Sequence, residues 1–292
     1  MATLGAMVFI NFLVAEKWIF MIKNQIYCST GAFVGRINGR NYRLLIEYAD
    51  KLKCEGFEFM IFGDWYPQLK TIISEFKANN INIPVIHTDK NIGDLISDEK
   101  PESFKKCIEK FKINFDAAVE LGAKKAVVHI WGIPDSDNNY EMIYERVGIL
   151  LDISKQYNVK MLAENCFCKN KSPLEHFIKL SEIYPDIGFI IDTRPAQFHR
   201  ELDKICKSTL FEKGNIQHIH INDYKGGYKD WDAMYPIYQP GQGDVDFTMF
   251  FDYLKKTGYN NSITLEAPSM LPDRVDIETL NKSLLYLKSC LN

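Results

Sequence analysis

Six polar residues of the kinds that bind metals or move protons each end a short apolar stretch of this 292-residue chain. One buried polar residue is usually a satisfied structural group, but six in the same position of successive segments indicate a shared site. They are three histidines and three acids: His87, His129, Glu164, Asp192, His220 and Glu266. Carboxylates and imidazoles together form a ligand set for Mn²⁺, Mg²⁺, Co²⁺ or Zn²⁺.

Four of the six, Glu164, Asp192, His220 and Glu266, are the predicted ligands of one divalent metal ion. Asp192 follows Glu164 by 28 residues, and His220 follows Asp192 by 28 residues, as expected for one repeating unit per step. Unpaired carboxylates close together raise one another's pKa values, and a bound dication removes that repulsion. The alternative is that these carboxylates pair with lysine or arginine side chains.

The register of the apolar stretches supports a common site. Side chains alternate across a strand, so Leu162 shares a face with Glu164, and Ile190 shares one with Asp192. If the first member of each pair fills a core, the second lies at its mouth. By the same rule, His218 is expected one layer below His220, as a core residue and not a ligand.

The polar residues lie on segments that alternate with amphipathic helical patterns. The expected strands are residues 24–29, 56–62, 81–88, 125–132, 159–166, 187–193, 216–223 and 262–268. The expected helices are residues 41–54, 66–80, 103–123, 140–158, 173–185, 202–210, 247–259 and 277–291. Eight strand–helix units predict a single (β/α)₈ TIM barrel with its active site at the C-terminal ends of the strands. The alternative is an open doubly wound sheet, which is disfavoured because no GxGxxG motif follows the first strand of this chain.

Composition narrows the class of protein. The chain is 46% hydrophobic and carries a net charge of −3, which excludes a disordered chain and disfavours a basic nucleic-acid binder. Its seven cysteines form no paired framework, which favours free thiols and a cytoplasmic location. Residues 1–20 are apolar, lack a positive leader and are too short to span a bilayer. We therefore expect an N-terminal extension outside a barrel of residues 21–292, and no membrane partner.

Five motifs carry a family resemblance: LAENC, FIIDT, HIHIND, PGQGDVDF and TLEAP. In this order they resemble the xylose-isomerase-like TIM barrel superfamily, in particular its sugar phosphate isomerase/epimerase group, over the chain from Met21 to the last helix. The resemblance implies one metal ion at the barrel mouth, held by the four ligands predicted above. It also implies that Glu164 and Glu266 are catalytic, exchanging protons with a small sugar or sugar-like substrate, and that the protein forms a homo-oligomer.

The chemistry of such a site follows from general principles. A bound cation polarises a carbonyl group and stabilises the enediolate formed when a neighbouring carbon loses its proton. One carboxylate removes the proton, and the same group or its opposite partner returns it. The predicted function is a metal-dependent isomerase or epimerase of a sugar, a sugar phosphate or a related hydroxy-carbonyl compound.

Further residues are candidates for substrate binding. His87 and His129 are expected to contact substrate, with a second metal ion or hydrogen bonds inside the barrel as alternatives. Trp131 is a candidate for stacking on a sugar face, and Asn165 is a candidate for orienting its neighbours. Lys225 is a candidate for binding a substrate phosphate or carboxylate.

Arg194 is a second candidate for that anion, and the chain departs from its relatives just after it. Endonuclease IV-type nucleases of this superfamily carry a histidine where this chain has Pro195, and an Asp-x-His where residues 230–232 read Asp-Trp-Asp. Nuclease activity and a nucleic-acid partner are therefore not expected. Many sugar-acting members also carry that histidine, and His199 is a candidate substitute.

Two other functions fit the same residues. A metal-dependent dehydratase of the inosose or dehydroshikimate type would share the metal and the proton removal, and would then expel a hydroxyl group. A non-catalytic sugar-binding barrel is the other alternative, and the complete ligand set argues against it. The aromatic-rich loop of residues 223–244 is expected to form a lid or a subunit contact, with Asp246 as the N-cap of the next helix.

Overall fold

The computed structural model describes residues 24–132 and 137–291, so the N-terminal extension predicted over residues 1–20 lies outside the described residues. Eight parallel strands pair in chain order and close into a barrel when β8 pairs with β1. The strands are β1 Ile26–Ser29, β2 Gly56–Met60, β3 Val85–His87, β4 Lys125–His129, β5 Lys160–Glu164, β6 Gly188–Asp192, β7 Ile216–Ile221 and β8 Ser262–Leu265. The predicted (β/α)₈ barrel is confirmed.

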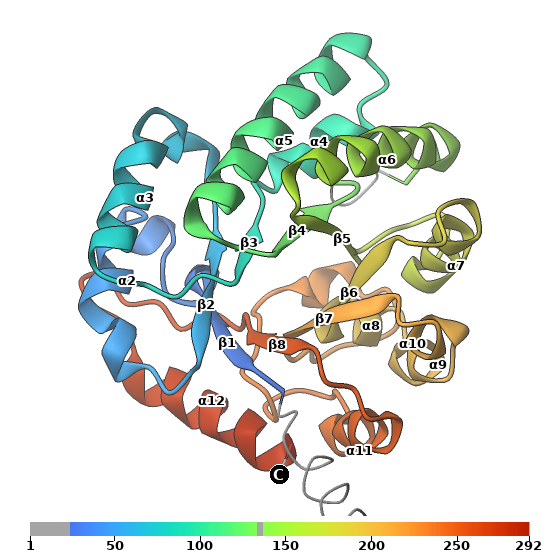
Figure 1. Cartoon of the computed structure of the whole chain (residues 1–292). Helices are drawn as coiled ribbons and strands as arrows, with labels where there is room; N and C mark the ends of the chain where they lie inside the picture. Colours follow the sequence, from blue (N-terminus) through green and yellow to red (C-terminus); the bar gives the residue numbers. More distant parts are fainter. Residues whose placement is uncertain (1–23, 133–136, 292) are drawn as a thin grey trace, which may run out of the picture.

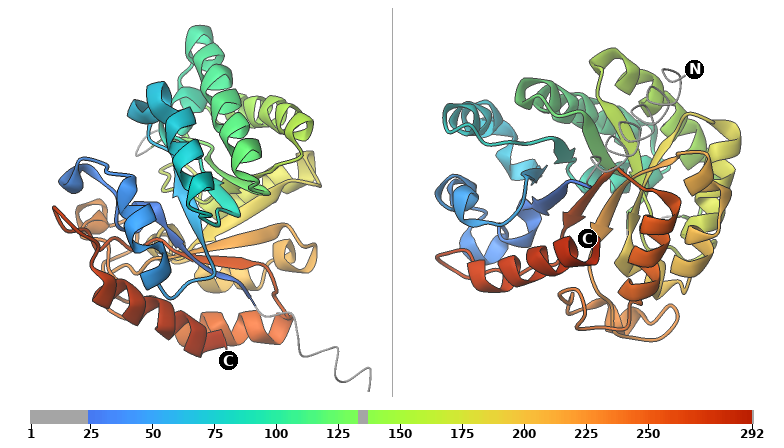
Figure 2. Two further views of the ribbon diagram at one scale, coloured as in Figure 1. Left: turned by 60° about the vertical axis from the view of Figure 1, so that its left-hand side comes forward. Right: turned by 60° about the horizontal axis from the view of Figure 1, so that its bottom comes forward.

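Helices surround the strands on the outside of the barrel (Figure 1). They are α2 Arg43–Tyr48, α3 Leu69–Ala78, α4 Asn91–Ser97, α5 Pro101–Leu121, α6 Tyr140–Ser154, α7 Pro173–Ile183, α8 Thr193–Phe198, α9 Leu202–Cys206, α10 Thr209–Glu212, α11 Phe247–Thr257 and α12 Ile277–Leu291. The last helix, α12, packs against β1 and α11, on the side of the barrel where the first and last strands pair (Figure 2). No helix among the described residues is long and apolar enough to cross a membrane.

Two short helices, α4 and α8, were not predicted from the sequence. Each lies in the loop directly after a strand, and each contains a residue that disfavours helix, Gly93 in α4 and Pro195 in α8. Gly93 is required by packing, because a Cβ atom there would lie 2.6 Å from the backbone oxygen of Trp131. Asp246 caps α11 as predicted, accepting a hydrogen bond from the backbone N–H of Met249.

The barrel interior below the mouth is divided into an apolar and a polar part. The apolar part is a cluster of Tyr27, Val85, Val127, Leu162 and Ile190, all buried. Leu162 and Ile190 therefore lie where the alternation rule predicted. Burying each such aliphatic side chain contributes about 1.5–3 kcal/mol.

The polar part, which we call the deep polar cluster, consists of Glu58 from β2, His218 from β7, and Ser262 and Thr264 from β8. His218 Nε2 lies 2.9 Å from Glu58 Oε2, and Thr264 donates a hydrogen bond to the same oxygen at 3.2 Å. Ser262 lies 2.7 Å from the other ring nitrogen of His218. Hydrogen bonds to neighbours thus replace lost water at Glu58 Oε2 and at both ring nitrogens of His218, while the buried Glu58 Oε1 has no partner among the described residues.

Candidate metal centre at the barrel mouth

Four side chains converge at the C-terminal ends of β5, β6, β7 and β8 and form what we call the mouth cluster: Glu164, Asp192, His220 and Glu266. One ligand atom of each lies within 4.8 Å of those of the other three. Glu164, Asp192 and His220 are buried, and the Glu266 side chain is 10% exposed. Three carboxylates here face one imidazole, so acceptors outnumber donors.

His220 connects the mouth cluster to the deep polar cluster. Its Nδ1 lies 3.0 Å from Glu164 Oε1 and 3.4 Å from Glu266 Oε2. Its Nε2 lies 2.9 Å from Glu58 Oε2, so the Nε2–H bond donates downward. A carboxylate that accepts from one ring nitrogen of a histidine leaves the other nitrogen available for a metal ion.

The charges of the mouth cluster perturb the ionisation of its members. Burial raises the pKa of Asp192 to about 7, and the negative charges of Glu266 and Glu164 add to this effect. Burial alone would raise the pKa of Glu164, but the imidazoles of His129 and His220 hold it well below its usual range. Burial alone would lower the pKa of His220, but Glu58, Glu266 and Glu164 raise it well above its usual range.

Two asparagines hold the carboxylates in place. Asn165 brackets the backbone of Asp192, accepting from its N–H at 2.5 Å and donating to its carbonyl oxygen at 2.9 Å. Asn222 donates to both carboxylate oxygens of Asp192 and to Glu266 Oε2, each at 3.2 Å. Asn165 was expected to orient its neighbours. Asn222 was missed, although it lies two residues after His220 and therefore on the same face of the chain.

Comparison with known proteins identifies the family. The family model described as "Xylose isomerase-like TIM barrel" matches residues 46–290. The chain belongs to this family. The match confirms the predicted superfamily. A comparison with curated protein sequences finds no match.

Solved structures of similar fold are related to this family member at low sequence identity. The 3-keto-D-glucoside 4-epimerase YcjR from E. coli superposes with a TM-score of 0.67 at 17% identity, covering 92% of this chain and 100% of the other. A D-allulose 3-epimerase from Methylomonas sp., in complex with D-allulose, gives 0.71 at 15% identity, covering 91% and 97%. The IOLI protein with a bound zinc atom gives 0.66 at 16% identity, covering 91% and 96%.

A pocket of about 340 Å³ opens at the mouth of this xylose isomerase-like barrel. Its walls include all three carboxylates of the mouth cluster, together with His129 and Asn165. His129 Nε2 lies 2.8 Å from Glu164 Oε2, so the histidine both borders the pocket and holds a predicted ligand. His129 and Asn165 thus both line the pocket at the mouth.

His87 lies beneath this pocket and does not line it. Its side chain is fully buried, and its Nε2 is 3.3 Å from Glu164 Oε2. His87, His129 and Glu164 also have ligand atoms close enough together to hold a metal ion. Because His87 does not line the pocket, the structure contradicts its predicted contact with a substrate there. A second metal ion and hydrogen bonds inside the barrel remain as its alternative roles.

Three other predicted substrate contacts are corrected by the structure. Trp131 is fully buried and donates its Nε1–H to the backbone oxygen of Phe167, because the loop after β4 folds the ring inward. His199 is also buried and does not reach the pocket, because its Nε2 accepts from the backbone N–H of Cys168 at 3.3 Å. Lys225 is exposed and lies outside the pocket walls.

Lys90 and Asp223 have roles that the sequence did not reveal. Lys90 lies at the rim of the pocket with its Nζ 3.6 Å from Glu266 Oε1. Asp223 holds the return of the 223–244 loop, accepting from the backbone N–H groups of Gly241, Gly243 and Val245. A Cβ atom at Gly243 would lie 2.5 Å from Asp223 Oδ1, so this close approach requires glycine. The loop is thereby fixed over one side of the mouth.

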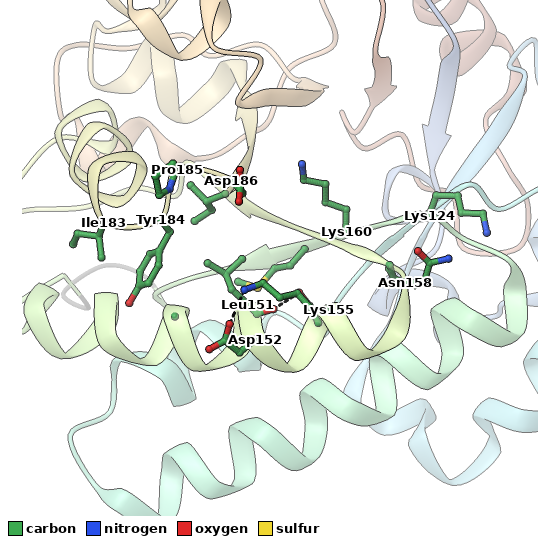
Figure 3. Close-up of a pocket in the computed structure, with 15 residues that line it drawn as sticks. Lys124, Leu151, Asp152, Lys155, Asn158, Lys160, Ile183, Tyr184, Pro185 and Asp186 are labelled. Atoms are coloured by element: carbon green, nitrogen blue, oxygen red, sulfur yellow. Dashed lines mark hydrogen bonds and ion pairs between the residues drawn. The ribbon is translucent and has the colours of Figure 1, made fainter.

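A larger cavity, of about 730 Å³, lies at the other end of the barrel between α6 and α7. Figure 3 shows Leu151 and Asp152 of α6 along one wall, with Tyr184 and Asp186 across from them. None of the groups of metal-competent side chains in the described part of the chain lies there. Size alone therefore does not mark the functional site in this molecule.

Proposed function

We propose that this protein is a divalent-metal-dependent isomerase or epimerase of a small sugar, a sugar phosphate or a related hydroxy-carbonyl compound. The observation that carries this proposal is the mouth cluster, in which three carboxylates and one imidazole converge at the wall of a substrate-sized pocket. The three carboxylates outnumber the one imidazole of the cluster, and the neighbouring His129 and Lys90 pair with Glu164 and Glu266 but not with Asp192.

The mouth cluster fits a divalent cation. Glu164, Asp192, His220 and Glu266 would hold it, and the mixed oxygen and nitrogen donors suit Mn²⁺, Co²⁺, Mg²⁺ or Zn²⁺. Burial, together with the negative charges of Glu266 and Glu164, raises the pKa of Asp192, and a cation would relieve the repulsion between the carboxylates. When bound, the cation would polarise a substrate carbonyl and acidify the adjacent C–H bond.

The protein's own carboxylates supply the proton transfer. The imidazoles around Glu164 hold its pKa well below its usual range, and Lys90 and His220 do the same for Glu266, although burial opposes both shifts. Both are therefore ionised at neutral pH, which is the state that a general base requires. They extend from β5 and from the residue after β8, which are separated by two strands on one side of the ring and by four on the other. Two bases on different sides of a substrate allow a proton to leave one face and return to the other.

The similar structures support this choice of reaction class. Two of them are named as a 3-keto-D-glucoside 4-epimerase and a D-allulose 3-epimerase, and a third contains a zinc atom. Their identity to this chain is 17% or less, so the substrate is not transferred from them.

The test is a metal-supplemented screen of ketoses, ketose phosphates and inososes in deuterated water. We expect Mn²⁺ or Co²⁺ to raise the melting temperature, and one substrate to gain deuterium at the carbon next to its carbonyl while forming an isomer. Water loss in place of isomer formation would assign the dehydratase reaction instead. No thermal shift with any of the four metals, and no exchange with any compound, would leave a non-catalytic sugar-binding barrel.

A further inference from the structure

Arg194 is a buried cation at the wall of the mouth pocket. It is the second residue of α8, two positions after Asp192, and only 8% of it is exposed. Its side chain makes no hydrogen bond or ion pair with any residue that the structure describes, and its Nε is a buried donor without an acceptor. An unpaired buried guanidinium is costly unless a ligand satisfies it.

Arg146 shows how the same barrel treats a structural arginine. It is also 8% exposed, but its guanidinium donates to the backbone oxygens of Ile96, Asp98 and Glu99. The two arginines thus have equal burial and opposite pairing. The difference indicates that the N–H donors of Arg194 are available to bind a ligand.

Two aromatic rings hold Arg194 without using its donors. Its Cζ lies 4.7 Å from the ring centre of Phe167, on the loop after β5, and 5.6 Å from that of Tyr235, on the 223–244 loop. Such contacts occupy the flat faces of a guanidinium and leave its edge free. A free edge with parallel N–H groups matches the two oxygens of a carboxylate or a phosphate.

The nearby carboxylates already have other partners. Asp192 accepts from Asn222 and from the backbone N–H of Arg194, while Glu266 is paired with Lys90 and faces His220. None of these contacts uses a side-chain donor of Arg194. Pro195 beside it lines the pocket without a side-chain hydrogen-bonding group, and the buried His199 does not line it, so Arg194 is the charged side chain that α8 presents to the pocket.

We propose that Arg194 binds an anionic group of the substrate, a carboxylate or a phosphate ester, while the mouth cluster acts on the carbonyl end. This inference rests on the proposed function and narrows it to acidic hydroxy-carbonyl compounds. A pocket of about 340 Å³ includes both Arg194 and the carboxylates of the mouth cluster, so one small molecule reaches both.

The experiment compares three ketoses that share a head group and differ at the far end: D-fructose, D-fructose 6-phosphate and D-fructuronate. Affinities for the metal-supplemented full chain are measured by calorimetry, so the readout does not depend on turnover. We expect one of the two anions to bind at least tenfold more tightly than D-fructose, because a charge-assisted hydrogen bond contributes about 1.5–3 kcal/mol. The stronger anion distinguishes phosphate from carboxylate.

Three variants then locate the effect. Arg194→Gln should remove about 10- to 100-fold of the affinity for the preferred anion and less than threefold for D-fructose. Arg194→Lys keeps the positive charge but loses the paired N–H groups of the guanidinium, and it should lose less of the affinity for the anion than Arg194→Gln. Arg36→Gln, at an exposed arginine in the loop after β1 and outside the pocket, is the matched control and should change neither affinity.

Two results would overturn the inference. The first is that neither anion binds the unaltered protein more tightly than D-fructose, a measurement that does not depend on any variant folding. The second is that Arg194→Gln weakens the binding of all three ketoses by the same factor. Metal binding is followed separately by the melting temperature and tests the proposed function. If no metal bound, the proposed function would be wrong. If metal bound but the three ketoses had equal affinities, only the proposal for Arg194 would be wrong.

Discussion

The mouth cluster and the deep polar cluster are built from the same kinds of side chain, yet they are balanced differently. In the deep polar cluster one carboxylate, Glu58, faces an imidazole and a hydroxyl that both approach its Oε2. In the mouth cluster three carboxylates face one imidazole. Their pKa values differ accordingly: that of Glu58 is lowered to about 2 by His220 and His218 despite burial, while that of Asp192 is raised to about 7.

This contrast shows how one barrel separates structure from chemistry. In the deep polar cluster, His218, His220 and Thr264 all approach Glu58 Oε2, so the charge of this carboxylate is stabilised by the protein, although its Oε1 lacks a partner among the described residues. Where acceptors exceed donors, a ligand or protons must restore the balance. The following changes test this division, beginning with the largest expected effect.

Glu164→Gln and Glu266→Gln should each reduce turnover by about 10²–10⁴-fold, because an amide cannot accept the substrate proton. Each should also weaken metal binding, since a charged ligand is lost. Both proteins should stay folded, because glutamine has nearly the same shape as glutamate and both positions lie at the mouth, outside the apolar core of the barrel. Turnover is followed as deuterium exchange and folding by circular dichroism. Activity that survives in both variants would contradict the catalytic assignment.

Glu58→Gln should weaken metal binding by about 10- to 100-fold although Glu58 does not line the pocket. The reason is that Glu58 accepts the Nε2–H of His220 and thereby orients the imidazole. Metal affinity is measured by titration. Nitrogen NMR of the metal-loaded protein should show that the Nε2 resonance of His220 shifts, an effect that general destabilisation would not produce. An unchanged affinity in a folded variant would mean that the deep polar cluster does not act on the mouth.

The sequence was sufficient to predict the barrel and the mouth cluster. Apolar stretches ending in acids or histidines at a regular spacing placed Glu164, Asp192 and His220 on successive strands, and parallel strands bring such ends together. Residues two apart on a strand share a face, and His218 lies one layer below His220 as expected, in the deep polar cluster.

The remaining site residues depend on how loops pack, which the strand pattern does not encode. Glu58 lies within a hydrophobic strand, and its contacts with His218 and His220 form only because barrel closure leaves just β1 and β8 between β2 and β7. Trp131 follows His129 by two residues, but the loop after β4 turns its ring into the core, where it packs 4.6 Å from the ring of His176. Lys90 reaches Glu266 across the mouth from the loop after β3, a contact between distant segments.

Metal binding should become tighter with rising pH up to about pH 7. The raised pKa values of Asp192 and His220 mean that the metal-free protein holds protons on both groups below that pH, and a metal ion must displace them. We expect the apparent affinity for Mn²⁺ to rise at least about tenfold per pH unit between pH 5 and 6, and to rise less steeply above pH 7. Calorimetry in buffers of different ionisation enthalpy counts the protons released. Release of no proton at pH 6 would contradict the imbalance at the mouth.

Thr264→Val should have the smallest effect and therefore tests the division most sharply. The substitution keeps the shape of the side chain but removes the hydroxyl that donates to Glu58 and lies 2.9 Å from His218 Nε2. Glu58 keeps both imidazole partners, so the free energy of unfolding should fall by about 1–2 kcal/mol while metal affinity changes less than threefold. Chemical denaturation and metal titration measure the two quantities. If Thr264→Val weakened metal binding as much as Glu58→Gln, the two clusters would have to be regarded as one continuous network, in which the balance of donors and acceptors in the deep part sets the affinity of the mouth.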